Sequence, residues 1–119
     1  MGFNRFEDID AWQLARVLAQ EIYEVTLIGS FSRDFALSDQ INRAAGSAMD
    51  NIAEGFDVGS NKEFVRFLSY AQRSCSEVQS QLYRACDRSH ITEEQFEILY
   101  EKASHARSKI GGLINYLKK

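Results

Sequence analysis

The most distinctive polar pattern of this sequence lies between Gln40 and Gly55. Its polar residues recur at intervals of three and four positions, so on an α-helix they fall within an arc of about 80° that borders an apolar stripe. Such a row either forms a hydrogen-bond network that fixes the register of neighbouring helices or subunits, or it lines a ligand-binding or catalytic site. The residues of this polar ladder are Gln40, Arg43, Ser47, Asn51 and Glu54.

Two carboxylates, Asp50 and Glu54, stand four residues apart in the same stretch. Paired carboxylates can perform general acid–base chemistry, but at this spacing they are far more often surface charges. The stretch also ends at a predicted helix C-terminus, where the helix dipole disfavours negative charge. We therefore expect a cationic or amide-rich group to compensate them, either residues 60–62 or an arginine such as Arg73 or Arg107.

The histidines and cysteines offer no recognisable catalytic or metal-binding arrangement. His90 lies in a predicted loop, His105 faces away from the apolar stripe of its predicted helix, and neither has a second ligand at metal-binding spacing. Cys75 and Cys86 are separated on one predicted helix by a rise of about 16 Å, which is too far for a disulfide within the chain. The sequence also lacks a Gly-rich phosphate loop and a nucleophile elbow. We therefore predict no catalytic residue, no metal and no cofactor, and reduced thiols in a cytoplasmic protein.

A row of basic residues follows one face of the third predicted helix, opposite its apolar stripe. The row spans an arc of about 80° and a length of about 39 Å. It is either a nucleic-acid-binding face that follows an anionic backbone or the solvated, salt-bridged face of an ordinary amphipathic helix. Tyr70 alone offers a platform for base stacking, and the net charge of −3 disfavours a dedicated nucleic-acid binder. The row comprises Lys62, Arg66, Arg73, Arg84 and Arg88.

Helices must position these residues, because the composition favours a few long elements. The chain has 119 residues, 45% of them hydrophobic, with seven Gly and no Pro, and strand-rich folds of this size need more turn residues. Apolar residues recur at helical spacing in four segments. We predict one all-α domain over residues 1–119, an antiparallel up-down four-helix bundle. No apolar run approaches the roughly 20 residues of a membrane span, so we expect no membrane partner and no leader peptide.

Local signals indicate where the four helices begin and end. The first is expected over residues 8–27, ending at Gly29, and the second from about residue 38 or a little earlier to 54, ending at Gly55. The third and fourth, over residues 60–88 and from 92 almost to 119, begin with the capping-box sequences SNKE and TEEQ.

The first predicted helix has an unusually wide apolar face, about 180° against about 100° for a helix that faces one core. Trp12 and Tyr23 extend this face sideways. They either close the edge of the bundle or, in the interpretation we favour, meet a second copy of the chain. Together with the polar ladder they form the predicted seam between the subunits of a homo-oligomer.

The stretch from Gln40 to Gly55, with its ending NIAEG, resembles the hallmark of the 23S rRNA intervening sequence proteins, a family of four-helix bundles. The resemblance extends over essentially the whole chain. It departs from the family at Ser32, where Pro is frequent, and at Arg73, where Gly is frequent. The other matching residues are Phe6, Ala11-Trp12, Tyr23, the segment 60–68 (SNKEFVRFL), Ala71, Ser74, Glu77, Gln81 and Leu82.

The resemblance implies a ring-like homo-oligomer, with a pentamer as the expected form, and it implies no defined activity. Some relatives are encoded inside insertions in ribosomal RNA genes, and the family is similar to the accessory variability protein of diversity-generating retroelements, a basic bundle that binds nucleic acid and a reverse transcriptase. This chain is acidic rather than basic. We therefore expect a non-enzymatic, homo-oligomeric interaction or scaffold protein, and keep an RNA-binding accessory protein as the alternative. RNA or another protein would then be its further partner.

Overall fold

The computed structural model describes residues 2–119 and contains four α-helices joined by short connections. Two short 3-10 helices, η1 (Phe6–Asp8) and η2 (Gly29–Arg33), precede the first two α-helices. No strand is present within the described residues, so the prediction of an all-α, four-helix fold is confirmed. The α-helices are α1 (Asp10–Thr26), α2 (Phe35–Asp57), α3 (Asn61–Asp87) and α4 (Glu93–Leu117).

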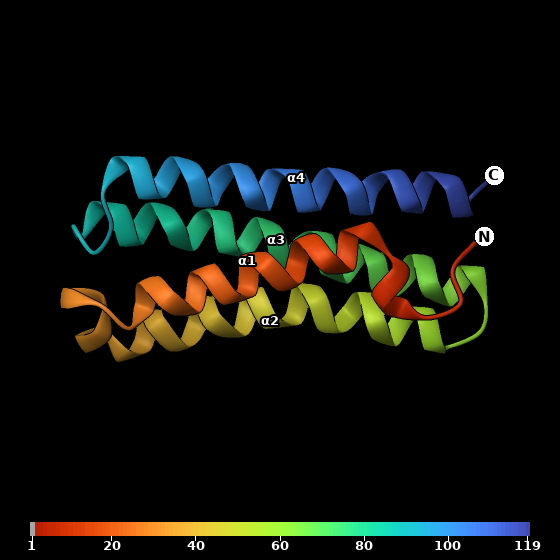
Figure 1. The fold of residues 1–119 in the computed structure, drawn as a ribbon, viewed down its shortest axis with the longest axis horizontal. Helices are drawn as coiled ribbons and strands as arrows, with labels where there is room; N and C mark the ends of the chain where they lie inside the picture. The colour runs from red at the N-terminus through yellow and green to blue at the C-terminus, as the bar shows by residue number, and fades with distance from the viewer. Residues whose placement is uncertain (1) are drawn as a thin grey trace.

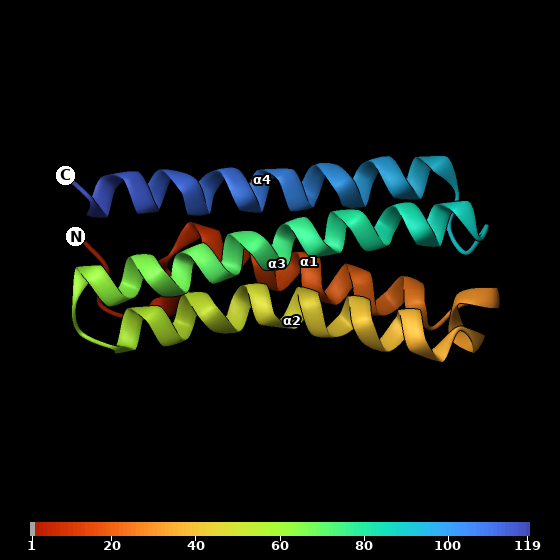
Figure 2. The same cartoon turned by 180° about the vertical axis from the view of Figure 1, so that it is seen from behind.

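The helices lie side by side along the long axis of a molecule that measures 44 × 21 × 19 Å (Figure 1). Each helix packs mainly against two others, since α1 and α3 both contact α2 and α4. Both termini lie at one end, together with the α2–α3 connection (Figures 1 and 2). The α1–α2 and α3–α4 connections lie at the opposite end, which we term the loop end.

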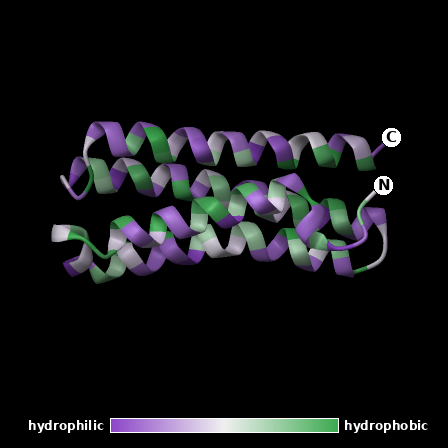
Figure 3. Ribbon diagram, viewed as in Figure 1, coloured by the Kyte–Doolittle hydropathy of each residue, from purple (hydrophilic) through white to green (hydrophobic). Residues whose placement is uncertain are grey.

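Two groups of buried apolar side chains form the core, one nearer the termini and one nearer the loop end. Figure 3 shows hydrophobic and hydrophilic residues alternating around each helix, as expected for amphipathic helices. In α3 the apolar residues that recur at steps of three and four positions are mostly buried, whereas Phe67 and Cys86 are half-buried; the buried ones are Phe64, Leu68, Ala71, Cys75, Val78, Leu82 and Ala85. Helical periodicity therefore identified the side of α3 that faces the core.

The prediction that the second helix ends at Gly55 is wrong. α2 begins at Phe35, continues to Asp57 and contains Gly55 as a buried position. A Cβ atom on Gly55 would lie 2.8 Å from the Cβ of Phe67 and 2.9 Å from Cδ1 of Phe64, both on α3. Gly55 therefore allows α2 and α3 to approach closely. The chain turns later, at Gly59, whose φ of +88° favours glycine.

The two predicted capping sequences start α3 and α4, but they differ in completeness. Thr92 and Gln95 form a reciprocal capping box, with the Gln95 amide N–H donating to Thr92 Oγ1 at 3.1 Å and the Thr92 N–H donating to Gln95 Oε1 at 2.9 Å. Ser60 accepts a hydrogen bond from the Glu63 N–H at 3.2 Å. The Glu63 carboxylate pairs instead with Arg66, so α3 has half of the motif.

Trp12 and Tyr23, the two aromatic residues assigned to the predicted seam, lie in different environments. Trp12 is 9% exposed, because Phe6 of η1 packs edge-on against it with 5.0 Å between ring centroids. The Arg16 guanidinium lies over the same indole ring, 5.7 Å from its centroid. Tyr23 is 49% exposed. Trp12 thus closes the edge of its own bundle, whereas Tyr23 presents its ring on the outer surface of α1.

Candidate interaction surfaces on the bundle

Two open hollows, of about 670 and 610 Å³, follow the outer side of the contact between α2 and α3. Both are lined by Ser47 and Glu77, so they form one continuous depression, the α2–α3 groove. Most of the residues that line its walls are polar. The α2 wall consists of Ala36, Asp39, Gln40, Arg43, Ala44, Ser47 and Asn51, and the α3 wall of Tyr70, Arg73, Ser74, Ser76, Glu77 and Gln81.

Four of the five residues of the polar ladder line this groove; Glu54 is exposed and does not line it. The Asn51 side-chain amide donates to the Ser47 carbonyl at 2.8 Å and to the Ser47 hydroxyl at 3.0 Å. Arg43 forms an ion pair with Asp39 one turn earlier on α2. These bonds stay within α2. The ladder therefore organises one wall of the groove.

Gln40 is the ladder residue that connects the two helices. Its Oε1 accepts a hydrogen bond of 2.6 Å from Nη2 of Arg84 on α3. This bond bridges the groove near the loop end and fixes the register of α2 against α3 there. One interpretation of the ladder was a hydrogen-bond network that fixes helix register. Within the described residues, one bond of the ladder, from Arg84 to Gln40, connects two helices.

The expected partners of Asp50 and Glu54 are not found within residues 2–119. Both carboxylates are exposed, and neither belongs to an ion pair in this part of the chain. The guanidinium of Arg73 lies 4.9 Å from the centroid of the Tyr70 ring, and that of Arg107 donates to Gln79. Because water solvates exposed carboxylates, they need no partner from the protein.

Gln81 is the most unusual side chain of the groove. It is 4% exposed, and its Oε1 is fully buried with no hydrogen-bond partner among the described residues. A buried acceptor without a donor costs about 1–3 kcal/mol, so few such groups occur in native proteins. The α2–α3 groove therefore contains a polar group that the isolated chain does not satisfy.

The contact between α3 and α4 also contains a buried glutamine, and this one is fully bonded. Gln79 is 5% exposed. Its Nε2 donates to the Ser104 hydroxyl at 2.8 Å and to the Tyr100 carbonyl at 3.4 Å, and its Oε1 accepts from Arg107 at 3.1 Å. Sequence reasoning assigned no role to Gln79; the signal available was a polar side chain directly beside Val78 of the apolar stripe.

The basic row on α3 is largely occupied by contacts within the chain. Arg66 pairs with Glu63 at 2.8 Å, Arg84 donates to Gln40, and Arg88 pairs with Asp34 at 2.9 Å. The two remaining members, Lys62 and Arg73, are exposed and belong to no ion pair within residues 2–119. The geometry thus resembles a salt-bridged helix face over much of its length.

One part of the row does combine basic and aromatic groups. The Arg66 guanidinium lies 5.6 Å from the centroid of Phe67 and 5.9 Å from that of Tyr70, and Arg73 lies over the same tyrosine ring. Phe67 and Tyr70 pack edge to face at 5.9 Å. This Arg66–Arg73 patch lies in the N-terminal half of α3. It is a cationic surface with an aromatic platform.

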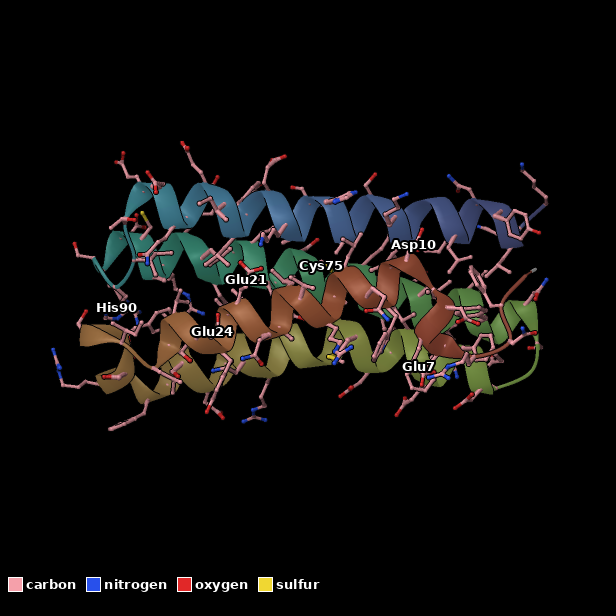
Figure 4. All side chains as sticks on the ribbon, in the orientation of Figure 1. Glu7, Asp10, Glu21, Glu24, Cys75 and His90 are labelled. Atoms are coloured by element: carbon pink, nitrogen blue, oxygen red, sulfur yellow. The ribbon has the colours of Figure 1, made fainter. Side chains whose placement is uncertain are left out.

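A polar cluster at the loop end was not predicted from the sequence. His90, in the α3–α4 connection, lies against the α1–α2 connection (Figure 4). Its Nδ1 is 2.7 Å from the Ser30 hydroxyl and its Nε2 is 2.8 Å from Oδ2 of Asp34. The imidazole stacks on the buried Phe31 ring, with 5.0 Å between centroids. Arg88 donates to the same Asp34 oxygen.

Ser30, His90 and Asp34 are connected by hydrogen bonds in the same order as the catalytic triad of hydrolases. The surroundings of these residues, however, indicate a structural role. The hydrogen bonds from His90 and Arg88 lower the pKa of Asp34 to about 2, and the same carboxylate caps α2 by accepting from the Leu37 N–H. The His90 side chain is 9% exposed. The five hollows of the α2–α3 groove, of α4 and of the contacts around α4 are lined by other residues than Ser30. The cluster joins the two connections at the loop end.

Among residues 2–119, no three or more His, Cys, Asp and Glu side chains are grouped so that they could hold a metal ion. None of the helices in this part of the chain combines the length and apolar character needed to cross a membrane.

The fold is a four-helix bundle with an open groove between α2 and α3 that is lined mostly by polar residues. The profile of the 23S rRNA-intervening sequence proteins matches residues 7–112, so this chain belongs to that family, as its sequence motifs indicated. It is similar in structure to a protein of unknown function from the S23 ribosomal protein family of Bacteroides thetaiotaomicron, with a TM-score of 0.79 and 22% identity over 87% of this chain and 97% of the other. Among curated proteins, no significant match to this sequence was found.

Proposed function

We propose that this protein is a homo-oligomeric interaction module without catalytic activity, in which up-and-down antiparallel bundles associate into a ring, with a pentamer as the expected form. The α2–α3 groove forms one side of the seam between subunits. The observation that carries the proposal is the open groove, which Gln81 lines with a buried oxygen that has no partner among the described residues. That oxygen is enclosed in the isolated chain, so a neighbouring copy satisfies it only if its docking in the groove opens the α2–α3 contact beside Gln81.

The outer face of α1 is the proposed second side of the seam. It exposes three large apolar side chains, since Val17 is 47%, Tyr23 49% and Leu27 57% exposed. Gln13, Gln20 and Glu24 lie among them on the same exposed face. A seam between two different faces is head-to-tail, and repeated head-to-tail contacts close into a ring when the rotation between subunits permits.

Native mass spectrometry and light scattering at micromolar concentration test this proposal. Wild-type protein should give a multi-subunit mass, and Asn51→Leu and Tyr23→Glu should each reduce it, because they change opposite sides of the seam. Val58→Glu changes an equally exposed apolar residue outside the seam and should leave the mass unchanged. A monomeric wild type, or a mass insensitive to both seam variants, would contradict the proposal.

An RNA-binding accessory protein is the second candidate, and the Arg66–Arg73 patch favours it. Two guanidinium groups flank the Tyr70 ring, and stacking of bases on aromatic rings supports single-strand binding. Tyr70 and Arg73 also line the α2–α3 groove, so this candidate requires that part of the groove to stay open to the nucleic acid. The family name refers to ribosomal RNA, which is consistent with such a role.

Binding to a structured RNA at low salt tests this second candidate. Binding should weaken steeply as salt rises and should be lost in the double variant Arg66→Glu, Arg73→Glu. The pair Arg5→Glu, Lys118→Glu makes the same change in charge outside the patch and serves as the control. No binding by the wild type, or equal losses in the two double variants, would contradict it.

We also propose a cytoplasmic location. Cys75 and Cys86 are both free thiols, as is usual in reducing compartments. Burial raises the pKa of Cys75 to about 11, so this thiol stays protonated and unreactive in the folded protein.

A further inference from the structure

The outer surface of α4 carries a row of exposed residues that the other three helices do not cover. Its members are spaced three and four residues apart and fall within an arc of about 80° on the side opposite the core. The row is about 33 Å long, and all seven of its residues are exposed. They are Glu94, Ile98, Glu101, His105, Lys109, Gly112 and Tyr116.

Charge is distributed unevenly along this helix. Residues 93–101 contain four glutamates and no Lys or Arg, whereas residues 102–117 contain Lys102, Arg107 and Lys109 and no acid. The helix dipole accounts for charges in the first and last turns only. Glu101 and Lys109 lie in the middle of α4, and neither forms an ion pair within residues 2–119. Both side chains are therefore available to pair with a group from another molecule.

The row is complementary to itself when it is read in the opposite direction about His105. Glu101 then faces Lys109, and Ile98 faces Gly112, at equal separations from the centre. Ile98 is 48% exposed, and a Cβ on Gly112 would meet no atom within 4 Å. An open, mainly apolar hollow of about 590 Å³ lies beside Ile98 and His105. Ile98 therefore protrudes, and the space that would receive Ile98 of another copy lies over Gly112 rather than in this hollow.

We propose that two copies of this chain pack through α4, antiparallel about a two-fold axis at His105. Glu101 of each copy pairs with Lys109 of the other, and Ile98 of each copy lies over Gly112 of the other. A two-fold contact uses the same surface on both copies, and the placement of Glu101 and Lys109 at equal separations from His105 meets this requirement. The seam proposed above uses α1, α2 and α3, so the two contacts are compatible.

The expected strength of this contact follows from its size. A stable protein interface buries at least about 1,200 Å² of surface in total, and the face of a single helix buries less. Pairing of two isolated bundles through α4 is therefore weak. Two rings joined by several α4 contacts at once associate more strongly, because each contact after the first forms at a high effective concentration.

Sedimentation velocity over a concentration series up to about 100 μM at low salt tests the proposal. The wild type should show a concentration-dependent species of twice the basal mass. Glu101→Lys and Lys109→Glu should each weaken that doubling by about tenfold, since two attractive pairs become repulsive. The double variant Glu101→Lys, Lys109→Glu should regain it, because the exchange restores opposite charges across the axis.

A matched control makes the same charge changes at the two ends of α4, outside the row. The double variant Glu93→Lys, Lys118→Glu should double in mass like the wild type. The proposal is overturned if the wild type shows no doubling, if the single variants double normally, or if the charge exchange fails to restore doubling. Basal mass reports separately on the seam: loss of the basal oligomer in Asn51→Leu, with doubling retained, would leave the α4 contact intact.

Discussion

Gln79 and Gln81 stand two positions apart on α3, and both are at least 95% buried, at 5% and 4% exposure. The carboxamide of Gln79 faces α4, where its oxygen and nitrogen are both bonded. Gln81 faces the α2–α3 groove, where its oxygen has no partner. Two identical residues on one helix thus differ in whether their side-chain oxygen has a hydrogen-bond partner.

The difference shows which helix contact satisfies the hydrogen bonds of its buried polar groups within the chain. The α3–α4 contact satisfies its own polar groups and fixes the register of the two helices without help. The α2–α3 contact is tight at Gly55 but opens into a groove further along, and there it leaves an acceptor unpaired. A contact that is complete only in the presence of another molecule is a reason to look for an interface there.

The largest expected effect tests the tight end of the α2–α3 contact. Gly55→Ala places a methyl group against Phe67 and Phe64, and overpacking should lower the free energy of unfolding by about 1–3 kcal/mol. Gly46→Ala is the matched control on the same helix, because a Cβ there meets nothing within 4 Å. It should stabilise the protein by up to about 1 kcal/mol through helix propensity. Urea unfolding measures both variants. If Gly55→Ala is as stable as Gly46→Ala or more stable, the α2–α3 contact at Gly55 is loosely packed.

Replacing each buried glutamine with the similarly shaped methionine sharpens the comparison itself. Gln79→Met leaves the Ser104 and Arg107 groups unpaired and should cost about 1–2 kcal/mol. Gln81→Met removes an acceptor that has no donor, so in dilute protein it should be neutral or slightly stabilising. Urea unfolding at the lowest usable concentration measures both. Equal losses in the two variants would mean that the Gln81 amide is satisfied in the isolated chain.

A smaller effect concerns the loop end, where polar groups satisfy one another across two connections. Because the folded-state pKa of Asp34 is lowered from 3.8 to about 2, the carboxylate stabilises the fold above pH 4, and this contribution is lost as the pH falls towards 2. Asp34→Asn retains a helix-capping side chain but removes the charge next to His90 and Arg88. Its melting temperature should therefore lie below that of the wild type at pH 6, and the two should converge near pH 2.

The control for the loop-end experiment is Asp87→Asn, which removes an exposed carboxylate that forms no ion pair within residues 2–119. It should follow the wild type across the pH range. A constant difference between Asp34→Asn and the wild type from pH 6 to pH 2 would show that the charge of Asp34 does not contribute.

Local sequence patterns predicted the helices well, because the spacing of apolar residues reports directly on which side of a helix is buried. The stripe of α3 and the capping box at Thr92 follow from neighbours within a few positions of one another. Gly55 was misassigned for the opposite reason. A glycine that ends a helix and a glycine that admits a second helix look alike until the facing residues, Phe64 and Phe67, are known.

The candidate site was predicted in part. The polar ladder indicated one wall of the α2–α3 groove, but the facing α3 residues and the unpaired Gln81 depend on how α2 and α3 pack. The cluster around His90 joins residues 56 and 60 positions apart, and nothing in the local sequence of either connection indicates that they meet. Trp12 is covered by Phe6, which belongs to a short 3-10 helix. Neither this helix nor its contact with Trp12 was predicted from the sequence.

The position of both termini at one end of the bundle has a practical consequence. A second copy fused after Lys119 begins beside the point where the first one finishes, so a few flexible residues suffice to join them. Had the termini lain at opposite ends of the 44 Å molecule, a linker of at least about 13 extended residues would be required. Genes encoding two, three or five copies in tandem therefore offer a way to fix stoichiometry by covalent linkage and to place a single altered subunit at a chosen position in the assembly.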